Sequence, residues 1–324
     1  MQLPSQDLSV RPLTPDDLKD LTQLLITYDI ALYGKSEQTE ESVRANWQTA
    51  SFHPETDSWG VFTESNISIA AAGVEQEAYI HFYPFAYVHP DYQGRGIGTY
   101  LLHIMEQWIH ERLPLAPEHA RVISAVGANS KNMAVHHLFE REGYQTVRRF
   151  WRMRIEMSEP PPQPQWATGI TVRPYIREND EMPTFEMVEE AFRDHWGHLP
   201  NTFEQWASEY LNRPSFDPAL WFLACDDSRL VGGALCRYKQ ETGWVGKLAV
   251  LRPWRHKGVG HALLLHAFNE FYRRGTHDVE LVVDAQNLTG AVRLYERVGM
   301  HMARENIAYE KEMRAGVEMS TQTI

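Results

Sequence analysis

The chain has 324 residues, of which 43% are apolar and 23% charged, the composition of an ordinary globular protein. At about 150 residues per domain, this length indicates two domains, each large enough to bury its own core. The 31 Lys and Arg residues stand against 43 Asp and Glu residues, a net charge of −12. This balance argues against nucleic-acid binding, which needs clustered basic residues, and is compatible with cationic substrates such as amines.

The sequence shows no sign of export or membrane insertion. The N-terminus, "MQLPSQDLSV", has neither a charged n-region nor an apolar h-region, and no apolar run approaches the roughly 18 residues of a membrane span. Cys225 and Cys236 have no metal-ligand spacing and are too few for a disulfide framework. We expect a cytoplasmic protein, monomer or homodimer, with no metal, no membrane and no nucleic-acid partner.

Hydrophobic periods of 2 and 3.6 residues alternate along the second half of the chain, which predicts a mixed α/β fold. An opening strand is followed by two helical segments, three strands, a glycine-rich turn, a long helix, a strand, a helix and a final strand. The expected ranges are, in order, 170–174, 181–195, 202–212, 220–226, 229–240, 243–251, 261–274, 278–284, 288–298 and 305–313. The first half has the same order of elements.

The two halves also repeat each other in sequence. Val10-Arg11-Pro12 matches Val172-Arg173-Pro174 at an offset of 162, and "LFEREGY" (138–144) matches "LYERVGM" (294–300) at an offset of 156. Matches in the same order at nearly constant offset indicate a tandem duplication of one domain.

A proline-rich stretch, "EMSEPPPQPQWATG" (156–169), lies near the midpoint and favours an extended, unpacked linker. We therefore predict an N-terminal domain over 1–157, a linker over 158–168 and a C-terminal domain over 169–324.

Each half carries an apolar run, then a glycine-rich turn, then the start of a helix. The turns are "YQGRGIG" (92–98) and "WRHKGVG" (254–260), and both fit Q/R-x-x-G-x-G after a proline. Backbone N–H groups at a helix N-terminus have no intrahelical partner, and glycines let them approach a phosphate closely. The dinucleotide fingerprint lies near the start of its domain, whereas these turns lie late, which indicates a different pyrophosphate ligand.

The stretches "VHPDYQGRGIGTYLL" (88–102) and "LAVLRPWRHKGVGHALLLHAF" (248–268) resemble the acetyl-CoA pyrophosphate motif of the GNAT superfamily of N-acetyltransferases. "NLTGAVRLYERVGM" (287–300) resembles the second signature of that family. The resemblance covers nearly all of both halves, and the tandem layout is similar to double-GNAT proteins such as mycothiol synthase. It implies two tandem GNAT-like domains, each with a central, mostly antiparallel sheet flanked by helices.

The resemblance also implies acetyl-CoA as co-substrate. The residues expected to bind it in the second half are Leu248, Val250, Arg255, His256, Lys257, Gly258, Val259, Gly260, His261 and Asn287. Those expected in the first half are Val88, Gln93, Gly94, Arg95, Gly96, Ile97, Gly98 and Thr99. Asn287 is either a polar contact to CoA or a helix N-cap, and Gly299 is expected to end that helix.

Tyr295 is the predicted proton donor, because the resemblance implies a position near the CoA sulfur; its spacing with Ala291 and Val298 also fits a buried helical stripe. The matching residue in the first half is Phe139, which has no hydroxyl to donate. We therefore expect the C-terminal half to catalyse. The N-terminal half would bind CoA without turnover or shape the substrate cleft.

The general base is less defined in the sequence. Many relatives carry Glu at the strand position occupied here by Trp244 and, in the first half, by Phe82. The remaining candidates are Glu241 beside a turn, Asp284 at a strand end, where it could instead cap the next segment, and His195.

The predicted substrate-side residues are Trp244 and, in "AFRDHWGHLP" (191–200), His195 and Trp196. Trp and His side chains can hold a cationic or planar amine. Core packing of Trp196 and a surface position of His195 are the alternative.

The expected reaction is acetyl transfer from acetyl-CoA to a primary amine of a small molecule, by direct attack in a ternary complex. Two other classes stay open: a non-catalytic acyl-CoA-binding or sensor protein, suggested by Phe139, Trp244 and Phe82, and a peptide or protein N-acetyltransferase. An open acidic groove would favour the peptide substrate over a closed, aromatic-lined pocket.

Overall fold

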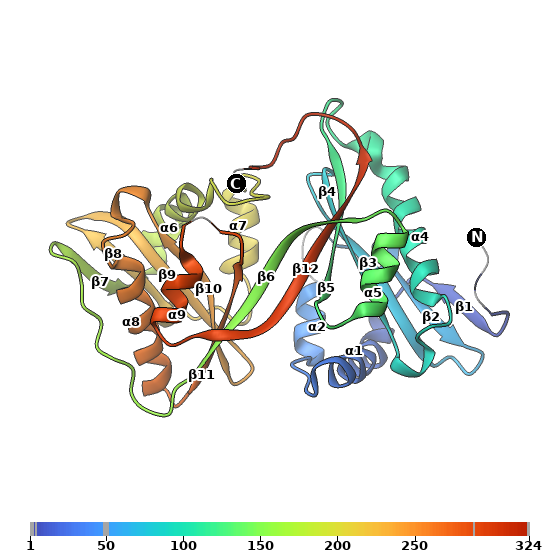
Figure 1. Ribbon diagram of the computed structural model, residues 1–324, viewed down its shortest axis with the longest axis horizontal. Helices are drawn as coiled ribbons and strands as arrows, with labels where there is room; N and C mark the ends of the chain where they lie inside the picture. The colour runs from blue at the N-terminus through green and yellow to red at the C-terminus, as the bar shows by residue number, and fades with distance from the viewer. Residues whose placement is uncertain (1–2, 4, 48–51, 288, 323–324) are drawn as a thin grey trace. The chain divides into compact units, whose positions relative to one another are not determined.

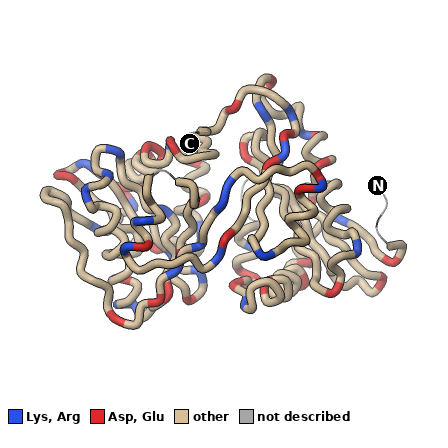
Figure 2. The backbone as a smooth tube through the Cα atoms, in the orientation of Figure 1, with Lys and Arg blue, Asp and Glu red and all other residues tan. Residues whose placement is uncertain are grey.

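The computed structural model describes residues 3, 5–47, 52–287 and 289–322, which form two compact units (Figure 1). Unit 1 takes its residues from Met1–Val147 and Ile307–Met319, and unit 2 from Arg148–Asn306 and Ser320–Ile324. Acidic and basic residues are interspersed along the chain in both units (Figure 2). The mixed α/β fold predicted from the alternating periods is confirmed.

Unit 1 has one sheet with helices packed against it. Its strands follow the order β1-β2-β3-β4-β5-β12; β1 to β4 pair antiparallel, and β4 pairs with β5 in parallel. The bounds of its elements are β1 Leu8–Arg11, η1 Pro15–Asp17, α1 Leu18–Tyr33, α2 Glu40–Trp47, α3 Pro54–Asp57, β2 Ser58–Thr63, β3 Ser68–Glu77, β4 His81–Val88, η2 Pro90–Tyr92, α4 Ile97–Arg112, η3 Leu113–Leu115, β5 Val122–Asn129 and α5 Met133–Arg141. Strands β6 Gln145–Glu156 and β12 His301–Arg314 contribute residues to both units.

Unit 2 repeats this arrangement with the order β6-β11-β10-β9-β8-β7. Neighbours pair antiparallel except β10 and β11, which are parallel, so the predicted mostly antiparallel sheet is confirmed. The bounds are β7 Ile170–Pro174, α6 Arg177–Phe192, α7 Phe203–Tyr210, η4 Pro218–Leu220, β8 Trp221–Asp226, β9 Arg229–Lys239, β10 Thr242–Val250, η5 Arg252–Trp254, α8 Val259–Arg273, β11 Asp278–Asp284 and α9 Ala291–Arg297.

Burial along the strands of unit 2 follows the period of 2 that the sequence carries. On β11, Val279, Leu281 and Val283 join the core cluster that contains α8, whereas Glu280 and Val282 face the other side of the sheet. A second cluster on that other side packs α6 and α7 against β8, β9 and β10. The sheet of unit 2 therefore lies between two helical layers.

The duplication extends to matching side-chain pairs. Arg11 donates two hydrogen bonds of 2.7 Å to the carboxylate of Asp17. Arg173 makes the equivalent bonds of 2.6 and 2.7 Å to Asp180. Each arginine is the residue that ends or nearly ends the first strand of its copy, so the two copies begin in the same way.

The units do not coincide with the predicted domains 1–157 and 169–324. Residues 148–157 belong to unit 2, and residues 307–319 return to unit 1, so each copy gives its last strand to the other unit. The chain passes from unit 1 to unit 2 inside β6, between Val147 and Arg148. A strand that continues through a boundary carries no proline or glycine signal, which is why sequence pattern did not reveal it.

The proline-rich stretch predicted as the linker over 158–168 lies inside unit 2 instead. It joins β6 to β7, the first and last strands in the unit 2 order β6-β11-β10-β9-β8-β7, and therefore crosses the strands between them. Gln163 and the carbonyl of Pro162 hydrogen-bond with Asn269 of α8, and the Trp166 ring lies 6.0 Å from that of His266. Extended polyproline geometry at about 3.1 Å per residue supplies the reach that this crossing needs.

Candidate active site

Strand β10 separates from its parallel neighbour β11 part-way along its length. The two strands pair at Gly243↔Val279 and Trp244↔Glu280, and the described residues show no pairing beyond Trp244. A β-bulge lies between Val245 and Lys247, where β10 pairs with β9. The bulge and the separation leave one backbone edge of β10 without a strand partner, available to a ligand that carries amide groups.

The corresponding strand of unit 1 separates in the same place but has no bulge. Strand β4 pairs with β5 at His81↔Ile123 and Phe82↔Ser124, the positions that match those in unit 2. Its pairing with β3 runs without interruption from Glu77↔His81 to Ala70↔Val88. The two copies therefore differ in backbone structure at the strand that precedes each glycine turn.

The second glycine turn has the geometry of an anion site. Gly258 is the N-cap of α8 with φ 82°, His256 has φ 60°, and no side chain caps the helix. Ala262 N–H donates to the Gly258 carbonyl, so the N–H groups of the three residues that open α8 precede the first helical bond. These three donors, at the positive end of the helix dipole, form a site for a phosphate.

The first glycine turn is built alike. Gly94 and Gly96 have φ 74° and 84°, Gly96 is the N-cap of α4, and Tyr100 N–H donates to its carbonyl. The side chains beside it are engaged within the protein, since Arg95 donates to the Asp91 carbonyl and Thr99 accepts from Arg141. Both turns therefore offer the same backbone donors.

The Gln or Arg that opens each motif ties the turn to the preceding strand. Gln93 Nε2 donates to the Val88 carbonyl at 3.1 Å, and Arg255 Nε donates to the Val250 carbonyl at 3.0 Å. Arg255 also donates to the Ala191 carbonyl at the end of α6, at 2.7 Å. These two predicted cofactor-binding side chains position the turn through hydrogen bonds inside the protein.

The last glycine of each motif permits close helix packing. A Cβ at Gly260 would lie 3.3 Å from Leu294 of α9 and within 4 Å of Val250 and Leu248, whereas one at Gly98 would lie 3.7 Å from Leu138. The side chains of Val250 and Leu248 therefore face the helix core, and contact with a cofactor there would have to use their backbone.

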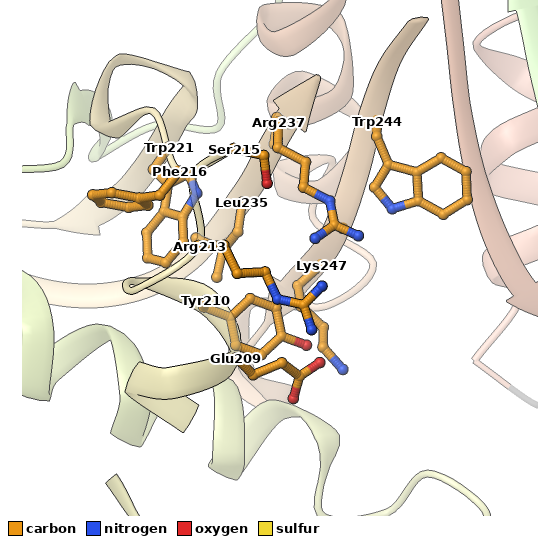
Figure 3. A pocket seen from close by; sticks show the side chains of 12 residues that line it. Glu209, Tyr210, Arg213, Ser215, Phe216, Trp221, Leu235, Arg237, Trp244 and Lys247 are labelled. Atoms are coloured by element: carbon orange, nitrogen blue, oxygen red, sulfur yellow. The ribbon is translucent and has the colours of Figure 1, made fainter. Parts of the chain in front are cut away.

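A pocket of about 200 Å³ lies in unit 2 on the side of the sheet covered by α6 and α7 (Figure 3). Strand β10 lines it with Trp244, Gly246 and Lys247, directly at the bulge. The remaining lining residues come from α7, the segment after it, and strands β8 and β9: Glu209, Tyr210, Arg213, Ser215, Phe216, Trp221, Leu235, Cys236 and Arg237.

Comparisons with known proteins decide the family. The description "Acetyltransferase (GNAT) family" matches residues 182–300, and "Acetyltransferase (GNAT) domain" matches residues 58–146. The crystal structure of a GCN5-related N-acetyltransferase from Sphaerobacter thermophilus is 36% identical, with a TM-score of 0.86, covering 98% of this chain and 99% of that chain. The chain belongs to the GNAT acetyltransferase family.

Two further relatives support a tandem GNAT protein. Mycothiol acetyltransferase from Thermobispora bispora is 30% identical over 243 residues, 69% of this chain and 74% of the relative. A tandem GNAT protein from the clavulanic acid biosynthesis pathway has a TM-score of 0.73 at 14% identity, covering 96% of this chain and all of that one, which shows a shared fold. The chain is a tandem GNAT acetyltransferase, as the two motifs predicted.

The proposed GNAT acid, Tyr295, is buried in the core cluster of unit 2. Burial raises the pKa of Tyr295 to about 12, so the phenol is protonated at neutral pH. Phe139 is buried at the matching place on α5 in unit 1, where its ring lies 5.4 Å from that of Tyr309. Tyr295 on α9 and Phe139 on α5 therefore occupy equivalent positions in the two copies and differ by one hydroxyl group.

The predicted bases do not line the pocket. Glu241 is exposed in the β9–β10 turn. Asp284 accepts a hydrogen bond from Gln286 N–H and so caps the turn after β11, which is the alternative role given to it from the sequence. Asn287 accepts from Thr289 N–H, while Gly290 is the N-cap of α9, so the N-cap interpretation of Asn287 is wrong.

The helix α9 ends as the sequence predicted. Gly299 follows it with φ 91°, and its N–H donates to the Glu296 carbonyl.

The predicted substrate-side residues lie in different surroundings. Trp244 lines the pocket and is 9% exposed, with the Lys239 amine 3.4 Å from its ring centroid. Burial, with the nearby charges of Lys247 and Arg255, lowers the pKa of His195 to about 4, and His195 is not among the residues that line the pocket.

Trp196 is engaged elsewhere in unit 2. Its Nε1 donates to Gln322 at 3.1 Å, and the Arg148 guanidinium lies over its ring. Trp196 is not among the residues that line the pocket.

Sequence reasoning missed the charged lining of the pocket, which comes from Glu209, Arg213, Arg237 and Lys247. These residues come from α7, the segment after it, and strands β9 and β10. They follow no regular spacing in the sequence, so no motif predicts that they meet. The described part of the chain brings no three His, Cys, Asp or Glu side chains close enough to hold a metal ion. None of its helices is both long and apolar enough to cross a membrane.

Proposed function

We propose that unit 2 transfers an acetyl group from acetyl-CoA to the primary amine of a small molecule, by direct attack within a ternary complex. One observation carries the proposal: β10 borders both parts that such a reaction needs. Trp244, Gly246 and Lys247 line the pocket, and the end of the strand at Val250 leads into the glycine turn. A thioester bound along β10 would then meet an acceptor held in the pocket.

The described residues fit acetyl-CoA on two counts. The unpaired N–H groups at the start of α8 suit a pyrophosphate, and the open edge of β10 suits an arm that contains amide groups. Acetyl-CoA supplies the thioester carbonyl, and the new C–N bond forms as the C–S bond breaks. The substrate ammonium loses two protons, one before attack and one as the amide forms, and the departing thiolate takes up one. The chain therefore needs a base for the amine and an acid for the thiolate.

The first proton is that of the amine. An amine with a pKa near 10.4 costs about 4.6 kcal/mol to deprotonate at pH 7, so a positioned base accelerates the reaction. Glu209 is the acid among the described pocket residues, and we propose that it takes this proton. Glu241 and Asp284 are the alternatives. Tyr295, protonated because its pKa is raised to about 12 by burial, is the proposed donor to the thiolate.

Unit 1 is proposed to bind CoA without turnover. Its turn keeps the backbone donors, while Phe139 lacks the hydroxyl of Tyr295 and β4 lacks the bulge of β10. Peptide acetylation is less favoured as the function of unit 2, because its pocket is small and lined by four aromatic residues.

The test is release of CoA thiol from acetyl-CoA over a panel of amines, with the N-acetyl product identified by mass spectrometry. Glu209→Gln, Glu241→Gln and Asp284→Asn are compared under the same conditions. We expect a roughly 10²- to 10⁴-fold lower kcat for the variant that removes the base, and near-normal rates for the other two. No turnover with any amine, in a protein that binds acetyl-CoA, would contradict the proposal.

A further inference from the structure

The pocket of unit 2 carries more positive than negative charge, although the whole chain is acidic. Arg213, Arg237 and Lys247 line it, against the single carboxylate of Glu209 among its described residues. Figure 3 shows the ends of the two arginines and of Lys247 pointing toward the same space, with Glu209 and Tyr210 at its border. The three cations come from β9, β10 and the segment after α7, so the fold gathers them at this one place.

Among the described residues, no hydrogen bond or ion pair joins these three cations to a carboxylate, although Glu209 attracts both Arg237 and Lys247 electrostatically. Arg237 Nε is buried and has no hydrogen-bond acceptor. The Lys247 amine lies 4.6 Å from the ring centroid of Phe192 and 5.9 Å from that of Tyr210. Several other arginines of unit 2 form ion pairs, as Arg173 does with Asp180 and Arg274 with Asp217. A buried donor left without an acceptor destabilises a protein, so its presence in a pocket indicates a ligand that satisfies it.

The electrostatic surroundings of these cations agree with this interpretation. Burial lowers the pKa of Lys247, and burial together with the charge of Arg213 lowers the pKa of Arg237. Both groups therefore lie in surroundings that disfavour a positive charge. A bound anion removes this penalty, and a guanidinium prefers carboxylate or phosphate oxygens because its donors match their geometry.

The size and walls of the pocket limit the ligand further. Its volume of about 200 Å³ lies below the roughly 300–1,000 Å³ of sites for drug-sized ligands. Tyr210, Phe216, Trp221 and Trp244 supply apolar surface beside the charges. The pocket therefore suits a small molecule with one anionic end and an apolar body.

We infer that the acceptor is a small primary amine that also bears an anionic group, in the first place the carboxylate of a free amino acid, bound by Arg237 and its neighbours Arg213 and Lys247. This inference rests on the proposed function, since it names the substrate class of the same site. The carboxylate accepts hydrogen bonds from the arginines, and the amine is left toward Glu209.

The experiment measures binding by calorimetry to the full chain in the presence of CoA, so that it does not depend on turnover. The probes are matched sets: L-phenylalanine, L-phenylalaninamide and phenethylamine; L-leucine, L-leucinamide and isoamylamine; phosphoethanolamine and ethanolamine. The variant is Arg237→Gln. The control is Arg229→Gln, which removes the same charge from the same strand outside the pocket, where Arg229 lies over Trp254.

In at least one set, the anionic amine should bind roughly 10- to 150-fold more tightly than its uncharged partners, the effect of one charge-assisted hydrogen bond. Arg237→Gln should reduce this preference to about threefold or less, and Arg229→Gln should keep it. If phosphoethanolamine is the only anionic amine that binds more tightly than its uncharged partner, the ligand is a phosphate ester and the amino-acid assignment is overturned. No preference in any set, or one that survives Arg237→Gln, would overturn the inference, even if amines are acetylated. Loss of all acetylation with the preference intact would instead contradict the proposed function.

Discussion

Replacing Gly258 by Ala tests whether the second turn binds acetyl-CoA. Gly258 has φ 82°, and a Cβ built there meets nothing within 4 Å, so the change adds strain without a clash. An L-residue in the left-handed region costs about 1–2 kcal/mol. For a unit of this size, that free-energy change lowers the melting temperature by about 2–8 °C. The new methyl group also stands where a phosphate would approach the N–H groups of α8.

Gly275→Ala is the matched control, because Gly275 follows the other end of α8. It has φ 84°, and a Cβ there also meets nothing within 4 Å. Both variants should therefore lose similar stability in thermal unfolding. Calorimetry with acetyl-CoA should show a roughly 10- to 150-fold weaker affinity for Gly258→Ala, equivalent to one lost charge-assisted hydrogen bond, and normal affinity for Gly275→Ala.

The stoichiometry of the same titration tests unit 1. If both turns bind, the wild type takes two acetyl-CoA molecules, and Gly96→Ala, at the N-cap of α4 with φ 84°, weakens one of the two sites. Unchanged affinity in a Gly258→Ala protein whose stability falls as expected would refute the assignment of this turn. Unchanged stability in both α8 variants would refute the argument from backbone conformation.

Three further changes test other parts of the structure. Tyr295→Phe should lower kcat about 10²-fold and leave acetyl-CoA affinity unchanged, because it removes a proton donor alone; equal kcat in steady-state assays would exclude that role. Arg152→Ala, which leaves the buried Glu280 without its ion-pair partner, should lower the free energy of unfolding by about 3–5 kcal/mol in urea titrations, against about 0–1 kcal/mol for the more exposed Arg149→Ala. The pKa of His195 is lowered from 6.5 to about 4 in the folded protein. Between these two pH values only the unfolded chain binds the proton, so the free energy of unfolding falls as the pH is lowered from 6.5 to about 4. The change is at most about 3 kcal/mol, and His195→Phe should flatten it; equal slopes in both proteins would contradict the burial of this ring.

The elements and the duplication could be predicted because they depend on local signals. The glycine turns at 92–98 and 254–260 combine a strand, left-handed residues and a helix start, and each of these has its own sequence pattern. The exchange of last strands could not be predicted, because a strand pairs equally well with either copy of a duplicated sheet. Proline content at 158–168 marked an extended segment correctly, but extended segments also cross sheets within one unit.

The site was predicted in part for a similar reason. Motif positions such as Gly258 and Tyr295 lie on α8 and α9, where the order of elements fixes their place. The charged pocket residues come from α7, the segment after it, and strands whose relative register is set only by folding. Nothing in the spacing of Glu209, Arg237 and Lys247 indicates that they meet.

The strand exchange offers a physical reason why a half without Tyr295 or the bulge is kept. Strand β6, encoded with the first half, pairs with β11 from Asp278 to Asp284 and so completes the unit 2 sheet beside the site. Its Arg152 forms the ion pair with buried Glu280 and lies 5.3 Å from the ring centroid of Trp244 in the pocket. Removing the first half would therefore leave β11 with an unpaired edge and Glu280 with an uncompensated buried charge. Unit 2 therefore requires residues 148–156 of the first half, whatever the turn of unit 1 binds.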